Sequence, residues 1–496
     1  MTATPTWTLA QWRAAYCDQG YSPQELLSPL LATLSTNDPA WLYLIDEAAL
    51  TERLESLEAQ RLASGSLDGL PLYGVPFAIK DNIDAAGMPT TCACPDFSRV
   101  PERSATVVER LEAAGAVLIG KTNLDQFATG LVGTRSPHGA VPNTFNAEFV
   151  SGGSSSGSAS VVARGLVPFA LGTDTAGSGR VPAGFNNIVG LKPSRGWLST
   201  SGLVPACRTL DCISVFALTV GDAETVATIA GGYDAADPYS RRNPCTAPVS
   251  VGTRPKLAVP DVPEFFGDVQ NQAVYEQALA KLRQGGAEIV PIDFAPFAEL
   301  AELLYYGPWV AERTLAVEGV EPEQINPVVR GIVQSGHDYT ACDAFRAEYR
   351  RAELARTIND LLDGFDALVV PTSPTLRTLA EMDVEPVRYN SQFGTYTNFT
   401  NLADLCALAV PAGFRSDGLP AGITFIAPAW HDRALSALGQ RWQETLALPL
   451  GATGQPLPST STAMPPEGCV RVAVVGAHLT GMPLNFQLTR RNAVLV

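Results

Sequence analysis

The chain has 496 residues, of which 46% are apolar and 17% are charged, so it can fill a large core and is not disordered. Its length corresponds to about three average domains, although α/β enzymes often form one larger unit. The formal net charge of −16 opposes general binding to the phosphate backbone of nucleic acids. On so acidic a protein, an anionic substrate would need a locally positive pocket.

The nine cysteines do not have the spacing of metal ligands. Cys92 and Cys94 come closest, but no second pair of Cys or His residues follows at zinc-site distance. We therefore expect reduced, mostly buried thiols and no metal site. Residues 1–12 lack the basic start and apolar run of a signal peptide, and no stretch reaches the ~18 apolar residues of a membrane span. These features favour a cytoplasmic protein with neither nucleic acid nor a membrane as a partner.

The expected elements begin with two helices. Ser22 and Pro23 can cap and start a helix that runs toward Leu34, and Leu and Ala recur at helical spacing over Asp46–Ala63. Short apolar strands then alternate with helices. The expected strands are 74–79, 116–119, 166–171, 256–259, 287–292, 367–370 and 422–426, and helices are expected at 105–114 and 154–164. This alternation predicts an α/β fold with a large mixed β-sheet.

The composition changes near the C-terminus. Residues 452–468 are rich in Pro, Gly, Ser and Thr, which is the composition of a linker. Val470–Val475 then has the pattern of a strand, but residues 469–496 are too few to bury a core of their own. Either this tail docks on the main body, or it begins a second domain that is cut off.

A run of small residues, Ser151-Gly-Gly-Ser-Ser-Ser-Gly-Ser158, is the most unusual segment of the chain. It leads into an expected helix, so backbone N–H groups and hydroxyls gather at a helix N-terminus. It is not a P-loop, because the Gly-Lys-Ser/Thr ending is missing. Taken alone, this run also fits a flexible loop.

Two further segments carry residues suited to catalysis. Gly172–Arg180 contains small residues that let the backbone turn closely around a substrate atom, and successive N–H groups in such a turn can form an oxyanion hole. Lys80 ends an apolar strand, and burial there would lower its pKa enough for a neutral amine to act as a base near pH 7. Taken alone, the first segment also fits a tight turn and the second a surface lysine.

Histidine offers little support for a Ser-His-Asp triad. None of the four histidines lies in a Gly-x-Ser-x-Gly elbow, and we expect structural roles for all of them. A serine nucleophile without histidine needs another base, and lysine is the known substitute.

These segments together resemble the signature blocks of the amidase-signature family, over about residues 20–450. The blocks are 74–83 (Gly-Val-Pro-Phe-Ala-Ile-Lys-Asp-Asn-Ile), 152–157 and 172–180. Their order is the family's, and so is the spacing of 24 residues between Ser154 and Ser178. The resemblance implies the amidase-signature fold, with helices on both faces of the sheet. It also implies Ser178 as nucleophile, Ser154 as a bridging serine after a cis peptide, and Lys80 as base. The implied oxyanion hole consists of the N–H groups of Thr175, Ala176, Gly177 and Ser178.

Within that family, the details are most similar to the allophanate hydrolases. Ala176 replaces the first of two glycines that most members carry before the nucleophile, and Gln126 stands where many members have Glu. The segments 131–137, 205–211 and 304–313 also match. The resemblance implies that Tyr305 and Arg313 contact the substrate and that Gly130 lines its pocket.

The resemblance also implies a domain organisation. Residues 1–451 would form the amidase domain with a helical N-terminal segment, and residues 452–468 a linker. Residues 469–496 would be the truncated start of a smaller C-terminal domain that allophanate hydrolases carry.

Allophanate is a small planar anion, and an arginine can hold a carboxylate through two hydrogen bonds. Arg313 lies four residues after Trp309 on a helix that Gly307-Pro308 would open, so the two share a face. We therefore expect a hydrolase that releases ammonia from the terminal amide of allophanate, leading finally to carbon dioxide and ammonia. This chemistry needs no metal or organic cofactor.

Several alternatives remain open at this stage. The chain could be an amidase for another small amide, one component of a glutaminyl-tRNA amidotransferase, or a scaffold without activity. The acidic charge argues against the amidotransferase, and the presence of Lys80, Ser154 and Ser178 argues against the scaffold. The substrate could come from urea or from cyanuric acid breakdown. We also expect a homodimer, for which the helical N-terminal segment offers an interface.

Overall fold

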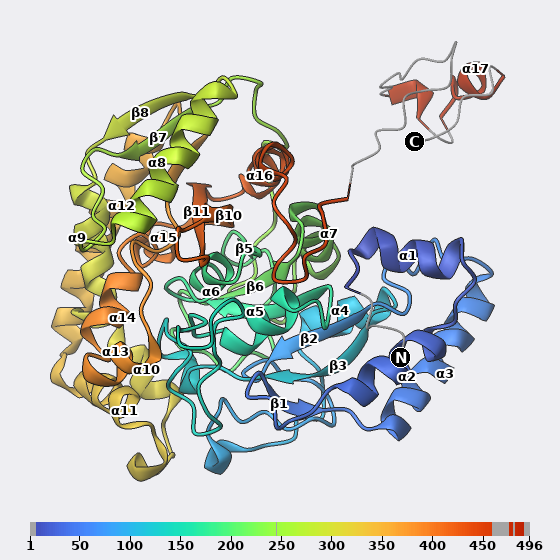
Figure 1. The fold of residues 1–496 in the computed structure, drawn as a ribbon, viewed down its shortest axis with the longest axis horizontal. Coiled ribbons are helices and arrows are strands. Elements are labelled where there is room, and N and C mark those ends of the chain that lie inside the picture. Colours follow the sequence, from blue (N-terminus) through green and yellow to red (C-terminus); the bar gives the residue numbers. More distant parts are fainter. Residues whose placement is uncertain (1–5, 245, 459–475, 480–481, 491–496) are drawn as a thin grey trace. The chain divides into compact units, whose positions relative to one another are not determined.

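The computed structural model describes residues 6–244, 246–458, 476–479 and 482–490 (Figure 1). The chain divides into two compact units, Met1–Leu457 and Pro458–Val496. In the second unit the described elements are the 3₁₀ helix η5 (Gly476–His478) and the short helix α17 (Phe486–Thr489). The strand expected at 470–475 and residues 459–468 of the expected linker lie outside the described residues.

One eleven-stranded sheet forms the centre of the first unit. Its strands are β1 (Trp41–Leu44), β2 (Pro76–Lys80), β3 (Val117–Thr122), β4 (Phe169–Asp174), β5 (Val189–Lys192), β6 (Cys212–Ala217), β7 (Lys256–Pro260), β8 (Glu288–Ile292), β9 (Ala367–Pro371), β10 (Leu405–Phe414) and β11 (Pro420–Pro428). Their order across the sheet is β1-β3-β2-β4-β6-β5-β10-β11-β9-β7-β8. Strand β2 runs parallel to β3 and β4, and β7 runs parallel to β8 and β9, whereas the other neighbours are antiparallel. The sheet is therefore mixed, as predicted.

Helices surround this sheet. They are α1 (Leu9–Cys17), α2 (Pro23–Thr33), α3 (Glu47–Ser64), α4 (Thr106–Ala113), α5 (Ser156–Ala163), α6 (Val181–Phe185), α7 (Val220–Ala230), α8 (Val269–Gln284), α9 (Ala295–Tyr305), α10 (Val310–Ala316), α11 (Pro327–Gln334), α12 (Ala341–Leu362), α13 (Leu379–Val384), α14 (Arg388–Phe393), α15 (Phe399–Leu402) and α16 (Asp432–Leu446). The 3₁₀ helices are η1 (Pro95–Phe97), η2 (Gln126–Ala128), η3 (Pro322–Gln324) and η4 (Ser335–Asp338). Figure 1 shows α1, α2 and α3 on the right of the unit, where α2 packs against α3.

Helix α2 begins where the sequence predicted it. The Ser22 hydroxyl accepts a hydrogen bond from the Glu25 amide, and the Glu25 carboxylate accepts one from the Ser22 amide at 2.8 Å. This capping box satisfies amide groups that have no partner inside the helix. Asp46 caps α3 in a similar way, through the amide of Ala49 at 2.8 Å.

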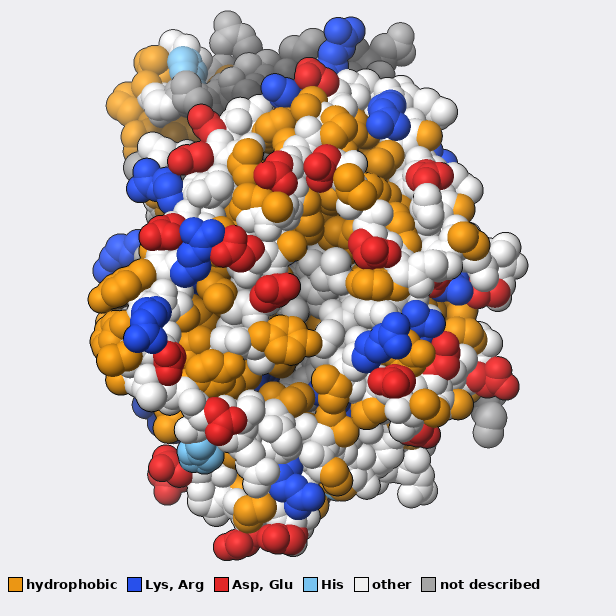
Figure 2. All heavy atoms as spheres, turned by 90° about the vertical axis from the view of Figure 1, so that its left-hand side faces the viewer, with side chains coloured by type: hydrophobic (Ala, Val, Ile, Leu, Met, Phe, Trp, Pro, Cys, Tyr) orange, Lys and Arg blue, Asp and Glu red, His pale blue; other side chains and the backbone are white. Residues whose placement is uncertain are grey.

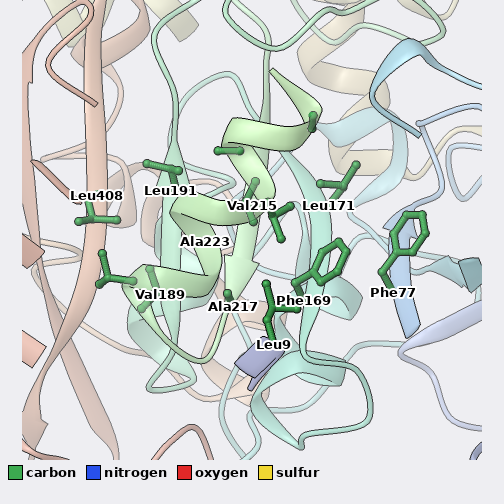
Figure 3. Packing of buried hydrophobic residues seen from close by; sticks show 14 of the residues in the cluster. Leu9, Phe77, Phe169, Leu171, Val189, Leu191, Val215, Ala217, Ala223 and Leu408 are labelled. Atoms are coloured by element: carbon green, nitrogen blue, oxygen red, sulfur yellow. The ribbon is translucent and has the colours of Figure 1, made fainter. Parts of the chain in front are cut away.

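The two faces of the central strands pack into different apolar clusters. On one face, Phe77 of β2 stacks on Phe169 of β4, with ring centroids 5.3 Å apart and planes 11° apart, and helix α7 covers the same cluster (Figure 3). On the other face, Ala170 of β4 packs with α5 residues such as Val161. Helices therefore cover both faces, as predicted, and the strands present apolar side chains on both sides.

The surface is not uniformly acidic. Figure 2 shows acidic, basic and apolar side chains interspersed on the face that lies at the left of Figure 1. Across the part of the chain that the structure describes, no helix has both the length and the apolar character needed to cross a bilayer.

Candidate active site

Lys80, Ser154 and Ser178 form a continuous chain of hydrogen-bonded side chains. The Lys80 ammonium donates to the Ser154 hydroxyl with an Nζ–Oγ distance of 2.7 Å, and Ser154 Oγ lies 2.9 Å from Ser178 Oγ. All three side chains are buried, and Lys80 is 0% exposed. Three residues that stand far apart in the sequence therefore meet at one place.

The sheet and two loops bring these residues together. Lys80 is the last residue of β2, Ser154 precedes the first turn of α5, and Ser178 lies in the loop after β4, which pairs with β2. The Gly153–Ser154 peptide bond is cis. A side chain at Gly153 would collide with the Asp125 carboxylate, so only glycine fits there.

Burial makes Lys80 a candidate base. It lowers the pKa of Lys80 from its usual 10.5 to about 7. Nearby carboxylates oppose this effect, in the order Asp125, Asp211 and Asp174. A second acceptor also holds the ammonium, because Lys80 Nζ donates to Thr173 Oγ1 at 2.6 Å. A lysine with such a pKa is partly neutral at pH 7 and can then accept a proton.

A buried ion pair shapes the loop that carries Ser178. The Arg180 guanidinium binds the Asp174 carboxylate through two hydrogen bonds of 2.9 Å, and both side chains are 0% exposed. Burial raises the pKa of Asp174, but Arg180, with help from Lys192 and the Gly179 amide, lowers it more, so the net pKa lies below the usual 3.8. The same carboxylate accepts the amides of Gly177 and Gly179, at 2.9 and 3.0 Å. Asp174 therefore fixes the second half of this loop.

The amides near Ser178 differ in their availability. The Gly177 amide donates to Asp174, whereas within the described residues the amides of Thr175, Ala176 and Ser178 have no protein acceptor. Gly177 has a φ of +133°, a value that favours glycine. Donors of this kind can bind a negatively charged oxygen.

A second group of predicted residues gathers around Arg313. Tyr305 ends α9 and Arg313 lies on α10. This helix begins at Val310 and not at the expected Gly307-Pro308, which lie in the turn before it; Trp309 occupies the N-cap position without a side-chain hydrogen bond. The Arg313 guanidinium donates to Thr129 Oγ1 at 2.9 Å and to Tyr305 Oη at 3.3 Å, and it lies over the Tyr305 ring.

Arg313 has an unusual environment for a buried cation. It is 1% exposed, its Nε has no hydrogen-bond partner, and no carboxylate of the described residues forms an ion pair with it. Asp211 and Glu312 act on its charge from beyond ion-pair distance and help to raise its pKa. An anion in direct contact with the guanidinium would add to this favourable environment.

Asp125 links the turn at Gly130 to the segment that contains Ser154. Its carboxylate accepts the amides of Val132 and Gly133, at 3.1 and 3.0 Å, and its own amide donates to the Ser154 carbonyl at 3.1 Å. Gly130 has a φ of +156°, and a side chain there would meet the Asp125 carboxylate at 2.6 Å. Gly130 is the residue after Thr129, whose hydroxyl accepts a hydrogen bond from Arg313.

Sequence reasoning assigned no role to Thr173, Asp125 or Asp211. All three lie inside segments that resemble the family, but their contacts depend on which strands and loops are neighbours. Asp211 accepts a hydrogen bond from the Thr175 hydroxyl, and it stands opposite this loop because β6 pairs with β4. The signal available in the sequence was a polar residue, Asp211, directly before the apolar stretch that forms β6.

The described cysteine and histidine side chains lie outside the Lys80–Ser154–Ser178 chain. In the described parts of the chain, no group of three or more His, Cys, Asp or Glu side chains is placed to hold a metal ion. Seven described cysteines are unpaired, and five of them are buried. The imidazole rings of His431 and His478 bond to Pro428 and Gln487 and not to the serines.

The chain is similar to known amidases over most of its length. A family model described as Amidase matches residues 25–435. A urea amidolyase of Lachancea kluyveri is 46% identical over 494 residues, which cover 95% of this chain and 27% of that protein. The chain thus spans well under two thirds of this curated relative.

Two other proteins match over more of their own length. The solved structure of Kluyveromyces lactis allophanate hydrolase is 45% identical with a TM-score of 0.88, covering 100% of this chain and 83% of that one. A glutamyl-tRNA(Gln) amidotransferase chain of Symbiobacterium thermophilum is 35% identical over 85% of this chain and 93% of that protein.

Proposed function

The chain belongs to the amidase family, and from this premise we propose that it is a serine amidohydrolase with Ser178 as nucleophile. The observation that carries the proposal is the unbroken hydrogen-bonded chain Lys80–Ser154–Ser178, buried and ended by a lysine whose pKa is about 7. A nucleophilic hydroxyl needs a base within hydrogen-bond distance, and this relay supplies one without histidine.

In the proposed mechanism, the hydroxyl hydrogens reorient so that Ser178 donates to Ser154 and Ser154 donates to neutral Lys80. Ser178 Oγ attacks the amide carbonyl carbon while its proton passes to Ser154 and the proton of Ser154 passes to Lys80. The protons return along the same path to the leaving nitrogen, which departs as ammonia. Water then attacks the acyl-enzyme, and the relay accepts its proton. General-base assistance of this kind contributes about 10²–10⁴ in rate.

The amides of Thr175, Ala176 and Ser178 would bind the oxyanion that forms in each step. Gly177 would join them by sharing its hydrogen between the oxyanion and Asp174. Each such donor stabilises the transition state by roughly 3 kcal/mol, because the loop holds the donor in place before the reaction.

We further propose allophanate as the substrate. Its terminal amide would face Ser178, and its carboxylate would accept hydrogen bonds from Arg313 and Tyr305 next to the Gly130 turn. The buried Arg313, whose guanidinium has no carboxylate of the described residues within ion-pair distance, supports this assignment, as does the similarity to an allophanate hydrolase. Hydrolysis would yield ammonia and N-carboxycarbamate, which decomposes to carbon dioxide and more ammonia.

The biological setting is part of the proposal. The substrate would arise in urea degradation, the activity that the name of the Lachancea relative indicates, or in cyanuric acid degradation. We propose a cytoplasmic homodimer that associates through the helical N-terminal segment. Residues 1–451 would be the amidase domain, 452–468 a linker, and 469–496 part of a C-terminal domain.

Covalent labelling tests the nucleophile. A fluorophosphonate should label wild-type protein at Ser178, and Ser178→Ala should lose both labelling and ammonia release. Ser158→Ala is the matched control, because Ser158 lies in the same serine-rich segment and donates to the Leu171 carbonyl at 3.0 Å instead of the relay. Labelling of Ser178→Ala at the wild-type rate would exclude Ser178 as the nucleophile.

A further inference from the structure

Asp211 stands opposite the start of the loop that carries Ser178. Strand β6 pairs with β4 so that Cys212 faces Asp174, which places Asp211 opposite Thr175 one residue beyond the strands. The Asp211 carboxylate accepts the Thr175 hydroxyl with one oxygen. Its other oxygen accepts the amides of Ala206 and Cys207, at 2.7 and 3.1 Å. The carboxylate therefore joins two loops that are distant in the sequence.

Neutral donors make the hydrogen bonds to this carboxylate, and the charge of Arg313 acts on it from beyond ion-pair distance. Asp211 is 7% exposed, and no lysine or arginine of the described residues forms an ion pair with it. Burial raises the pKa of Asp211 to about 6, so the group is mostly ionised at pH 7. Because this pKa stays raised despite the charge of Arg313, the ionised carboxylate is less favourable here than in water. Stability alone is therefore a poor reason for an aspartate at this position.

The segment that ends at Asp211 also contacts α10. The Cys207 thiol lies 3.6 Å from the Trp309 carbonyl, and the Thr209 amide donates to the Glu312 carboxylate at 2.9 Å. Helix α10 carries Arg313, the proposed ligand of the substrate carboxylate. Asp211 thus lies between α10 and the oxyanion loop, residues 175–180.

The two halves of the oxyanion loop have different anchors. Asp174 and Arg180 hold the second half, from Gly177 onward. At the start of the loop, the Asn401 side chain donates to the Asp174 and Leu210 carbonyls, at 2.8 and 2.9 Å, so it ties the backbones of the two loops together. The Thr175 hydroxyl bonds to Asp211, which fixes the Thr175 rotamer and so restrains the backbone that carries the neighbouring amides.

We propose that Asp211 is a positioning residue for the reaction: through the Thr175 hydroxyl, it aligns the oxyanion-loop amides with the segment that supports Arg313. The inference rests on the proposed function, because it takes Ser178 as the nucleophile and these amides as oxyanion donors. Loss of the alignment lowers the acylation rate, since hydrogen bonds to the oxyanion depend strongly on direction. Substrate affinity changes little, because Arg313 still meets the carboxylate.

The test compares Asp211→Asn and Thr175→Val with Thr175→Ser, which keeps the hydroxyl. We expect kcat to fall about 10- to 100-fold in the first two variants, with KM within about threefold of wild type. Thr175→Ser should keep most of the wild-type kcat. In the double variant the losses should not add, because both changes break the same hydrogen bond.

A matched control separates positioning from folding. Asp432 is another buried carboxylate held by a hydroxyl, since Ser194 Oγ donates to it at 2.6 Å and the Ser194 amide at 2.8 Å. Asp432→Asn should lower the thermal midpoint and leave kcat unchanged. If Asp211→Asn does not fold, the comparison of Thr175→Val with Thr175→Ser still tests the proposal.

Two readouts keep this inference separate from the substrate assignment. The rate of fluorophosphonate labelling at Ser178 is measured beside allophanate turnover. Slow turnover of allophanate with fast labelling in wild type would contradict only the substrate, and the labelling rates would then decide the role of Asp211. If Asp211→Asn and Thr175→Val keep kcat and the labelling rate within about twofold of wild type, or change KM as much as kcat, the positioning role is overturned.

Discussion

Replacing Lys80 by methionine removes the ionisable group of the proposed relay and should change how activity depends on pH. In wild-type protein, the rate of Ser178 acylation should rise with pH and level off above about 7, because only the neutral amine accepts a proton. In Lys80→Met, the rate should fall on the order of 10²–10⁴ and should show no such rise. Fluorophosphonate labelling from pH 5 to 9 measures both effects without any assumption about the substrate.

The same substitution should change how stability depends on pH. The pKa of Lys80 is about 7 in the folded protein and 10.5 in the unfolded chain, so the unfolded chain binds one more proton between these values. The free energy of unfolding should therefore rise with pH in this window, by up to ~1.4 kcal/mol per pH unit. The full effect is on the order of 5 kcal/mol, and Lys80→Met should lack it.

Guanidinium unfolding at pH 7, 8, 9 and 10 gives the free energy of unfolding of wild-type protein and of Lys80→Met. The difference between the two values at each pH removes the contributions of the ionisable groups that both proteins share. Lys121→Met serves as a control, because Lys121 is also buried but donates to Thr90 and the Pro89 carbonyl instead of the relay. It should keep the rise in labelling rate near pH 7. A difference between wild type and Lys80→Met that stays constant from pH 7 to 10 would refute the reasoning.

Two further variants test the substrate contact and the loop. Arg313→Ala should raise KM for allophanate about 10- to 100-fold, because a hydrogen bond to a charged group contributes ~1.5–3 kcal/mol, and should change KM for propionamide less than about threefold. Equal effects on both substrates would contradict a carboxylate contact. Arg180→Met leaves Asp174 buried without its partner and should lower the free energy of unfolding by about 3–5 kcal/mol at pH 7. Wild-type stability of this variant in guanidinium would show that the ion pair is not needed.

Much of the fold could be predicted because local signals mark many elements. Ser22 and Asp46 cap helices, and the expected strands at 74–79 and 256–259 correspond to β2 and β7 within two residues at each end. Strand β4 begins at Phe169 instead of the expected Leu166, because Gly165 adopts a φ of +69° and the chain turns before the strand.

Strands β1, β5, β6 and β10 were not predicted. Strands β1 and β5 have only four residues each, too few for a pattern. Nearly all residues of β6 and β10 are buried, so their side chains do not alternate between apolar and polar. Such strands are hard to distinguish from a buried helix by sequence alone.

The candidate site shows a similar division. Lys80, Ser154 and Ser178 each lie in a distinctive segment, so the sequence could nominate them without knowledge of their contacts. Thr173 and Asp211 could not be nominated, because their partners follow from the order and register of strands in the sheet. Residues that act through neighbours in space leave little trace in a single sequence.

The most direct test of the account is ammonia release from allophanate, measured beside malonamate, biuret and propionamide under the same conditions. A site that bonds to the substrate carboxylate through Arg313 should reject an amide without one, and we predict a kcat/KM for allophanate at least about a hundredfold above that for propionamide. Malonamate, which keeps a carboxylate, should lie between them. If propionamide is hydrolysed as efficiently as allophanate, the substrate assignment and the role of Arg313 are contradicted, although the serine relay would stand.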